Sequence, residues 1–245
     1  MHLLVLPMEV SLVFFLKPDA VARRYAGARS LKMLMDNASD IEFLCFEEIR
    51  ACKDFLADQH YVEHKGKFFF DWLVDYIASG PILVSIIRTT NEGVSKIREI
   101  LGPTFPEKAE IEAPNSIRAR YGIMAGVNIA HASDSTESAK REASIWIPYL
   151  RDEFRIDISK SNPRVVEDAI QGYIQTYIDY PMVDPIRYRE LLRLVINDIE
   201  RRHEVETRIA KLLALEMGKE YVLSSYSSKL AKIIVDSVLL SKSKR

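Results

Sequence analysis

The chain has 245 residues, 48% of them apolar, so it can form one large domain or two modest ones around a real core. Its 34 basic and 35 acidic residues nearly cancel, which excludes the strong single-sign charge that coats nucleic acids or membrane surfaces. We therefore expect no membrane partner and no specific nucleic acid. Two cysteines, Cys45 and Cys52, exclude a disulfide framework and favour a reducing, cytoplasmic compartment.

The apolar start of the chain predicts a buried strand rather than a targeting segment. Met1 to Leu16 has neither the basic beginning nor the small-residue cleavage site that a signal peptide needs. We expect the strand at Val10 to Leu16. No apolar run in the sequence is long enough to cross a bilayer.

Short apolar runs alternate with amphipathic stretches through the first half of the chain. Further strands are predicted at Ile41 to Glu48 and Pro81 to Arg88. Helical patterns occupy Val21 to Met35, Lys53 to His60, Asn91 to Leu101 and Ser135 to Ile145. This order predicts an α+β fold with helices on one face of a mainly antiparallel sheet. Between Gly102 and Ile117 we expect a long, proline-rich functional loop.

Beyond Trp146 the patterns are helical only. Asn162 and Asp184 each precede a proline and read as helix starts, Gly218 reads as a stop, and a last amphipathic stretch covers Ser228 to Leu240. We place the domain boundary between residues 150 and 151, which divides the chain into 1–150 and an all-α C-terminal extension, 151–245. Apolar helix faces must be covered, so we expect a separately folded layer that the chemistry does not need.

A histidine stands just before a predicted helix start in the stretch NIAHASDSTESAKRE. Asp134 or Ser135 is a suitable N-cap, so His131 lies where free backbone N–H groups and the helix dipole favour an anion. Histidine suits phosphoryl transfer because one ring nitrogen can attack while the other is held by a hydrogen bond. Glu142, two turns into the helix, is a candidate for holding it.

Basic and hydroxyl side chains complete the parts that phosphoryl transfer needs. Lys17 follows the first buried strand, where a cation can meet a nucleotide hydroxyl or phosphate. Arg98, Thr104 and Arg118 bracket the proline-rich loop, and arginine forks and hydroxyls suit phosphate oxygens. Together they predict positioning and charge neutralisation of phosphates.

Three stretches carry a family resemblance: FLKPDAV from Phe15, HYVEHKGKFFFDWLVDYIASGP from His60, and the histidine motif from Asn128. Taken in order, they closely resemble the nucleoside diphosphate kinase family from about Val10 to Pro148. The resemblance implies a ferredoxin-like α+β fold, a ping-pong phosphohistidine mechanism, a cytoplasmic homo-oligomer, and Mg²⁺ bound mainly through the nucleotide phosphates with no protein metal ligands.

The resemblance also implies a role for each matching residue. His131 would be the nucleophile, Glu142 would orient its ring, Ser133 would support that pair, and Tyr61 would lie beside the histidine. The phosphates would be held by Arg98, Thr104 and Arg118, the sugar hydroxyls by Lys17 and Asn128, and the base by stacking on Phe69. Because stacking reads a ring face, base selectivity should be slight.

Some positions depart from the family pattern. Phe68, Ala125 and Val127 replace the usual proline, larger aliphatic residue and arginine, and we expect them to loosen the base clamp without changing the chemistry. Asn115 replaces a glycine in the proline-rich loop, which helps to build oligomer contacts in the family.

Two other hypotheses remain open from the sequence. His60, Glu63 and His64 spell the H-x-x-E-H pattern of inverted zinc peptidases, whose histidines could share a helix face. The chain could also be a non-catalytic nucleotide-binding or scaffold relative, with the helical tail docking a protein partner.

Overall fold

A five-stranded antiparallel sheet forms the centre of the computed structural model, which describes residues 10–218 and 224–240. The strand order is β2-β4-β1-β5, and β3 pairs with β4 next to β2. The strands are β1 (Val10–Leu16), β2 (Ile41–Phe43), β3 (Glu47–Ile49), β4 (Ile82–Thr89) and β5 (Ala130–Ala132). The predicted strand at Val10–Leu16 is confirmed, and it lies between β4 and β5.

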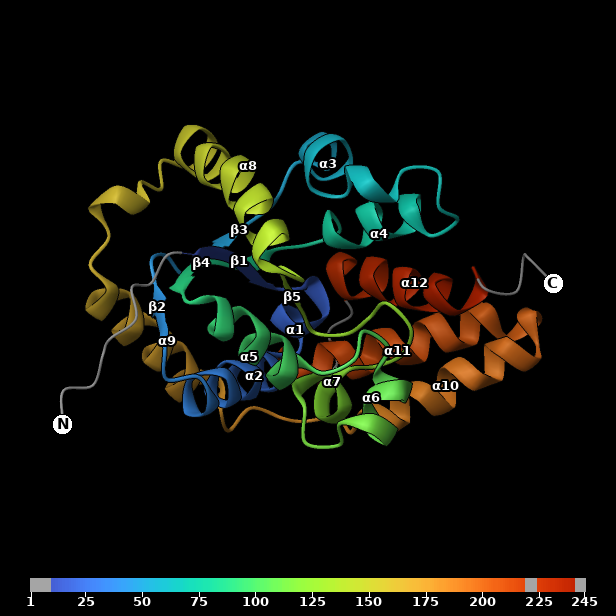
Figure 1. Ribbon diagram of the computed structural model, residues 1–245. Helices are drawn as coiled ribbons and strands as arrows, with labels where there is room; N and C mark the ends of the chain where they lie inside the picture. The colour runs from blue at the N-terminus through green and yellow to red at the C-terminus, as the bar shows by residue number, and fades with distance from the viewer. Residues whose placement is uncertain (1–9, 219–223, 241–245) are drawn as a thin grey trace.

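Helices surround this sheet along the first two thirds of the chain. They are α1 (Pro18–Ala22), α2 (Arg24–Asn37), α3 (Lys53–Phe55), η1 (Leu56–His60), η2 (Val62–His64), α4 (Phe70–Ile77), α5 (Asn91–Leu101), α6 (Pro106–Glu112), α7 (Ile117–Tyr121) and α8 (Thr136–Phe154). Figure 1 shows α3, α4 and α8 on one side of the sheet and α2, α5 and α7 on the other.

Both faces of the sheet are therefore buried. The predicted α+β fold with helices packed on an antiparallel sheet is confirmed, with the correction that helices cover two faces and not one. Successive side chains of a strand point to opposite faces. Accordingly, Val13 and Phe15 join one buried cluster, whereas Leu12 and Phe14 join the other. A strand buried on both faces is a continuous apolar run, which is why β1 shows no polar alternation.

Several predicted elements are divided in the structure. The predicted strand at Ile41 to Glu48 breaks into β2 and β3, and between them the backbone N–H of Ile86 donates to Cys45 Sγ at 3.2 Å. The helix predicted at Val21 to Met35 begins at Pro18 and is interrupted at Arg23, which has ψ 66°. Short local breaks of this kind leave the apolar pattern unchanged, so periodicity cannot locate them.

The proline-rich loop also differs from expectation, since it contains helix α6. Pro106 occupies the first turn, where its fixed φ suits a helix and its missing N–H costs nothing. Helix α4 and strand β5 were not predicted. Helix α8 runs well beyond the predicted end at Ile145, to Phe154.

The C-terminal helices are η3 (Ile158–Lys160), α9 (Pro163–Tyr177), α10 (Pro185–Asn197), η4 (Ile199–Arg201), α11 (Arg202–Glu216) and α12 (Ser225–Leu239). Asn162 and Asp184 are N-caps as predicted, with side chains accepting from Arg164 N at 3.2 Å and Ile186 N at 2.8 Å. Helix α9 packs against α2 and β2, where Ile170 contributes to a buried cluster.

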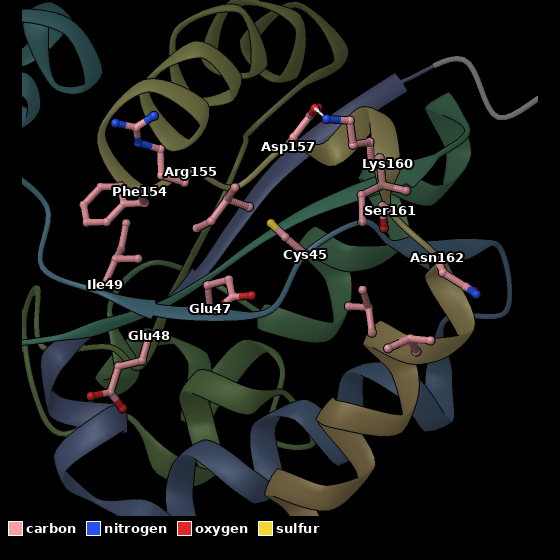
Figure 2. A pocket seen from close by; sticks show the side chains of 14 residues that line it. Cys45, Glu47, Glu48, Ile49, Phe154, Arg155, Asp157, Lys160, Ser161 and Asn162 are labelled. Atoms are coloured by element: carbon pink, nitrogen blue, oxygen red, sulfur yellow. Dashed lines mark ion pairs between the residues drawn. The ribbon is translucent and has the colours of Figure 1, made fainter.

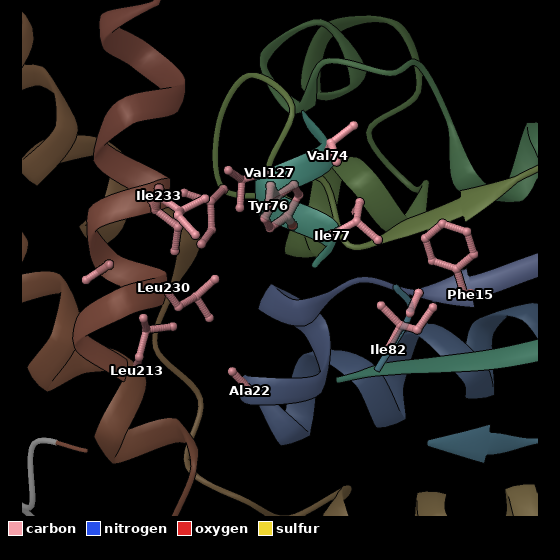
Figure 3. Packing of buried hydrophobic residues seen from close by; sticks show 14 of the residues in the cluster. Phe15, Ala22, Val74, Tyr76, Ile77, Ile82, Val127, Leu213, Leu230 and Ile233 are labelled. Carbon is pink, nitrogen blue, oxygen red and sulfur yellow. The ribbon is translucent and has the colours of Figure 1, made fainter. Parts of the chain in front are cut away.

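Helices α10 to α12 pack against the sheet domain and do not form a separate layer. Leu213 and Ile233 belong to the same buried cluster as Tyr76 and Val127. Figure 3 shows Ile233 of α12 on the side of its helix that faces Tyr76 of α4. The division into 1–150 and 151–245 stays a prediction, and its boundary falls inside α8.

A buried ion pair also joins the two regions. Arg23 Nε lies 3.1 Å from Glu216 Oε2, and both side chains are fully buried. Arg189 of α10 donates to the carbonyl oxygens of Ile123 and Gly122 at 2.6 Å and 2.8 Å. No helix within residues 10–218 and 224–240 is long and apolar enough to cross a membrane.

Candidate active site

His131 lies on β5, shortly before the N-terminus of α8. Ser135 caps α8 by accepting a hydrogen bond from Ser138 N at 3.1 Å. The imidazole stacks on Phe15, with ring centroids 4.8 Å apart, and its Nε2 lies 2.8 Å from Glu142 Oε2. One edge of the ring is thus held by α8, while the side chain keeps 17% of its surface exposed.

The Glu142 carboxylate is buried but ionised. Burial by itself would raise its pKa, yet the neighbouring His131 and a hydrogen bond from Ser133 Oγ at 2.8 Å bring the pKa down to about 2. An ionised carboxylate only accepts hydrogen bonds, so Nε2 of His131 carries the proton. In the neutral imidazole, Nδ1 then has the lone pair that can attack.

A pocket of about 610 Å³ opens beside this histidine, a volume that suits a small organic ligand. Nine of the ten residues predicted for the site line it: Lys17, Tyr61, Phe69, Arg98, Thr104, Arg118, Asn128, His131 and Glu142. The tenth, Ser133, is fully buried and donates a hydrogen bond to the Glu142 carboxylate.

Three cationic side chains converge on the pocket. Burial and the nearby Arg118 lower the pKa of Lys17 to about 7, and burial together with Arg98 lowers the pKa of Arg118. Arg98 pairs with Asp134 at 2.9 Å. Buried cations that repel one another are costly unless an anion joins them. The electrostatics therefore indicate an anion site next to His131.

Backbone carbonyls orient these cations. Arg118 donates to Gly102 O at 3.0 Å and to Ala130 O at 2.9 Å, while its buried Nε has no hydrogen-bond partner within the described part of the chain. Lys17 Nζ donates to Asn128 Oδ1 at 2.7 Å, and Asn128 in turn donates to Thr104 O at 2.7 Å. The amide thus links the lysine to the proline-rich loop.

The chain is strained immediately before β5. Ile129 has φ 78°, a region that β-branched residues rarely adopt. Its carbonyl accepts from Lys17 N at 2.8 Å, which fixes the turn that separates Asn128 from His131. Strain of this kind accumulates at sites where side chains must be presented in one geometry.

His60 lies beside His131, although in the sequence it is also part of the H-x-x-E-H pattern of zinc peptidases. It is 2% exposed, its ring meets that of His131 edge-on at 4.7 Å, and its Nδ1 accepts from Trp146 Nε1 at 3.1 Å. Burial and the neighbouring His131 keep its pKa well below the usual value. His60 is therefore a neutral packing partner of the nucleophile.

The zinc-peptidase arrangement is not present in the described residues. Among the described residues, three side chains of the kind that bind metals converge beside the pocket: His60, His131 and Glu142, whose potential ligand atoms lie within 4.8 Å of one another. Glu63 instead pairs with Arg141 at 3.3 Å, and His64 Nδ1 lies 2.9 Å from Lys67 Nζ. Within this trio, Nε2 of His131 and the Glu142 carboxylate already bind each other.

The pocket also contains residues that the sequence did not predict. Trp72 of α4 and Gly126 line it, as do Ser237 and Leu240 at the end of α12. Ser237 and Leu240 lie in a helical pattern without a motif, so the sequence carried no signal that they reach the site.

A second hollow, of about 620 Å³, lies between β3 and the segment that joins α8 to α9 (Figure 2). Asp157 and Lys160 at its rim pair with each other at 3.2 Å. Burial raises the pKa of its Cys45 thiol to about 12, which removes a nucleophile from this hollow. The chemistry is therefore concentrated in the pocket beside His131.

Comparison with known proteins agrees with this geometry. The family model described as nucleoside diphosphate kinase matches residues 10–151, more than half of the chain. A nucleoside diphosphate kinase of Streptomyces coelicolor is 40% identical over 133 residues, covering 54% of this chain and 92% of the relative. One from Clostridium perfringens is 40% identical over 141 residues, covering 58% and 92%.

A solved structure of the Aquifex aeolicus nucleoside diphosphate kinase superposes with a TM-score of 0.50 at 31% identity, covering 56% of this chain and 94% of that one. The family match ends at residue 151, inside α8, so it contains the sheet and His131 and leaves out helices α9 to α12. The chain belongs to the nucleoside diphosphate kinase family.

Proposed function

We propose that this protein is a nucleoside diphosphate kinase that passes a terminal phosphate between nucleotides through a phosphohistidine at His131. The observation that carries the proposal is the 2.8 Å contact between His131 Nε2 and the ionised Glu142, which leaves Nδ1 free in a pocket lined by cations. A nucleophile fixed by a carboxylate beside an anion site is the arrangement that covalent phosphoryl transfer requires.

In the first half-reaction, the Nδ1 lone pair of His131 attacks the γ-phosphorus of a nucleoside triphosphate. The N–P bond forms as the bond from phosphorus to the β-bridging oxygen breaks, and the nucleoside diphosphate leaves. No proton has to move, because Nε2 keeps its proton in the hydrogen bond to Glu142. In the second half, an oxygen of another diphosphate takes the phosphoryl group from Nδ1.

We propose roles for the other residues that line the pocket. Arg98, Thr104 and Arg118 bind the phosphates, and Lys17 with Asn128 binds the sugar hydroxyls. Tyr61 is 7% exposed and forms the wall next to His60 and the nucleophile, while Phe69 offers a ring face to the base. Ser133 holds Glu142 in place.

We further propose that Mg²⁺ enters as part of the nucleotide complex. The carboxylates lining the pocket each have a partner already: Glu142 has His131, Glu63 has Arg141, and Asp134 has Arg98. These residues fit a metal carried by phosphates better than a resident ion, since Mg²⁺ commonly binds through substrate phosphates and water. When bound, the ion neutralises charge on the transferred phosphate.

We propose a cytoplasmic homo-oligomer as well. Cys45 and Cys52 are both free thiols, which suits a reducing compartment. Ile111 on α6 and Ile186 on α10 are 84% and 52% exposed, and apolar surface of this kind favours self-association. A light-scattering mass in solution tests the oligomer. Docking of another protein by the tail stays a prediction.

Phosphoenzyme formation tests the central proposal. Incubation with Mg²⁺ and ATP labelled in its γ-phosphate should give an acid-labile, base-stable adduct, and unlabelled GDP should then remove the label as GTP. His131→Ala should reduce the adduct to background, whereas His203→Ala, on the exposed face of α11, should label normally. A wild-type protein that binds ATP without labelling would instead be the non-catalytic relative.

A further inference from the structure

The end of α12 reaches the nucleotide pocket. Ser237 and Leu240 both line it, although they lie far beyond residue 151, where the family match ends. Helix α12 is attached to the pocket wall by a hydrogen bond, because Trp72 Nε1 donates to Ile233 O at 2.9 Å. Ser237 follows Ile233 by one helical turn, on the same side of the helix.

A continuous set of contacts runs from the phosphate end of the pocket to α12. Lys17 Nζ donates to Asn128 Oδ1 at 2.7 Å and reaches Gly126 O at 3.5 Å. Gly126 lies directly against Trp72, since a Cβ added there would be 2.6 Å from the indole ring. The indole then bonds to Ile233. Gly126 and Trp72 therefore link the Lys17 side of the pocket to α12.

The chemistry of the reaction sets the direction of the ligand. The γ-phosphate must reach Nδ1 of His131, and Arg98 and Arg118 lie at that end, because they donate to the carbonyls of Ala132 and Ala130 on either side of it. The base, at the other end of the nucleotide, needs an apolar surface, and Trp72 together with the end of α12 offers one. Apolar and aromatic side chains also line the pocket: Phe68, Phe69, Trp72, Leu73 and Leu240.

We infer that the last turn of α12 forms one wall of the base subsite, so that the C-terminal extension takes part in nucleotide recognition. This inference rests on the proposed function. Ser237 Oγ donates to Ile234 O at 2.6 Å, which leaves the hydroxyl oxygen able to accept an N–H of the base. Leu240 is half-buried and supplies apolar contact. The partial negative charge of a helix C-terminus also favours N–H groups.

Photolabelling locates the base without altering the protein. An ADP analogue with an azide on the adenine ring is bound and irradiated, and the modified peptides are mapped by mass spectrometry. We expect adducts on residues 225–240 that excess ADP suppresses. Labelling confined to residues 61–73 and 125–128 would place the base away from α12 and overturn the inference.

Substitutions measure the contribution to affinity. Ser237→Leu fills part of the subsite and should raise the Kd for ADP by about tenfold, the lower range for a misfit in an apolar pocket. The Kd for inorganic tripolyphosphate, which has no base, should not change. Lys232→Ala, on the exposed side of the same helix, is the matched control. Unchanged ADP binding in a folded Ser237→Leu variant would contradict the inference.

Leu240→Ala provides a second variant if Ser237→Leu does not fold, because it only removes atoms from a half-buried side chain. It should weaken ADP and leave tripolyphosphate unaffected, and equal weakening of both ligands would count against a base contact. Failure of the proposed function is distinguishable, since it shows as a wild-type protein that does not phosphorylate His131. Photolabelling and the two Kd values do not depend on that step.

Discussion

The sequence constrains two regions of the molecule in different ways. The first runs from Lys17 to Glu142, and the second is the set of helices after Phe154. In the first region, particular polar side chains such as His131 and Glu142 contact each other directly, and their types define the chemistry. In the second, apolar faces recur with helical spacing, and Leu213 or Ile234 could be exchanged with other aliphatic residues of similar volume.

This difference shows that a helical extension can be generic in sequence yet specific in position. An apolar stripe indicates that a helix must be covered but not what covers it. The few polar groups of the extension are what fix its position: Glu216 meets Arg23, and the backbone of Ile233 meets Trp72.

The largest effect should come from the buried ion pair. Glu216→Gln keeps the shape and leaves the buried Arg23 guanidinium without its main counter-charge. Breaking such a pair costs about 3–5 kcal/mol, and we expect about 3 because Asp19 also favours the charged form of Arg23. Urea unfolding measures the change in free energy.

Glu204→Gln is the matched control on the same helix. Glu204 pairs with Arg201 and Arg208 at the surface, so its loss should barely alter the urea midpoint. Equal effects of the two substitutions would mean that the Arg23–Glu216 pair does not hold α11 against the sheet domain.

The next effect concerns the contact between the pocket and α12. Gly126→Ala puts a Cβ 2.6 Å from the Trp72 ring, so the indole must move away from Ile233 O. We expect a loss of about 1–3 kcal/mol in the free energy of unfolding, the usual cost of overpacking, together with weaker ADP binding.

Gly172→Ala is a control with the opposite sign. It lies inside α9 with nothing within 4 Å of an added Cβ, so alanine should stabilise by about 0.5–1 kcal/mol. Destabilisation by both alanines, measured by urea unfolding, would show that steric overlap with Trp72 is not the cause at Gly126.

Much of the site could be predicted because its residues lie in short motifs with typical chemistry. Nine of the ten predicted side chains line one pocket, and one of them, Lys17, directly follows the predicted strand Val10–Leu16. The motif of fifteen residues from Asn128 contains both partners of the central hydrogen bond, so sequence spacing alone places His131 and Glu142 close together.

Other features depend on contacts between distant segments, which periodicity does not encode. At the break between α1 and α2, the Arg23 side chain contacts Glu216, 193 residues away. Likewise, Ser237 reaches the pocket only through packing of α12 on α4. The helices on both sheet faces were missed for a related reason, since the apolar run of β1 reads the same whether one face or two are covered.

A smaller effect is expected at Glu142. Glu142→Gln removes the charge that fixes the protonated Nε2 of His131, so fewer rings present Nδ1 to the phosphate. Loss of such an orienting partner commonly costs about 10–100-fold, which we expect in the phosphorylation rate at saturating ATP. The Kd for ADP should not change, because Glu142 holds the nucleophile and not the ligand.

Glu153→Gln, exposed near the other end of α8, should phosphorylate at the wild-type rate in the same rapid-quench measurement. A Glu142→Gln variant that binds ADP far more weakly but phosphorylates normally once saturated would show that Glu142 acts on the ligand and not on the histidine ring.

The smallest effect is a proton taken up with the nucleotide at Lys17. Burial and Arg118 lower its pKa to about 7, so at pH 8 most of the free protein carries a neutral lysine. The phosphates bound by the neighbouring Arg98 and Arg118 favour the charged form of Lys17 and raise its pKa, so binding ADP at pH 8 should take up as much as about one proton. The affinity for ADP should therefore fall as pH rises above 7, by as much as about tenfold per pH unit until the pKa of Lys17 in the complex is reached.

Calorimetry at pH 8 in Tris and in Hepes counts the protons, because the observed enthalpy follows the ionisation enthalpy of the buffer. Lys17→Met should lose the uptake, whereas Lys96→Met, on the exposed face of α5, should retain it. Proton release, or equal uptake in wild type and Lys17→Met, would mean that Lys17 is already charged in the free protein and that the anion site is balanced by other groups.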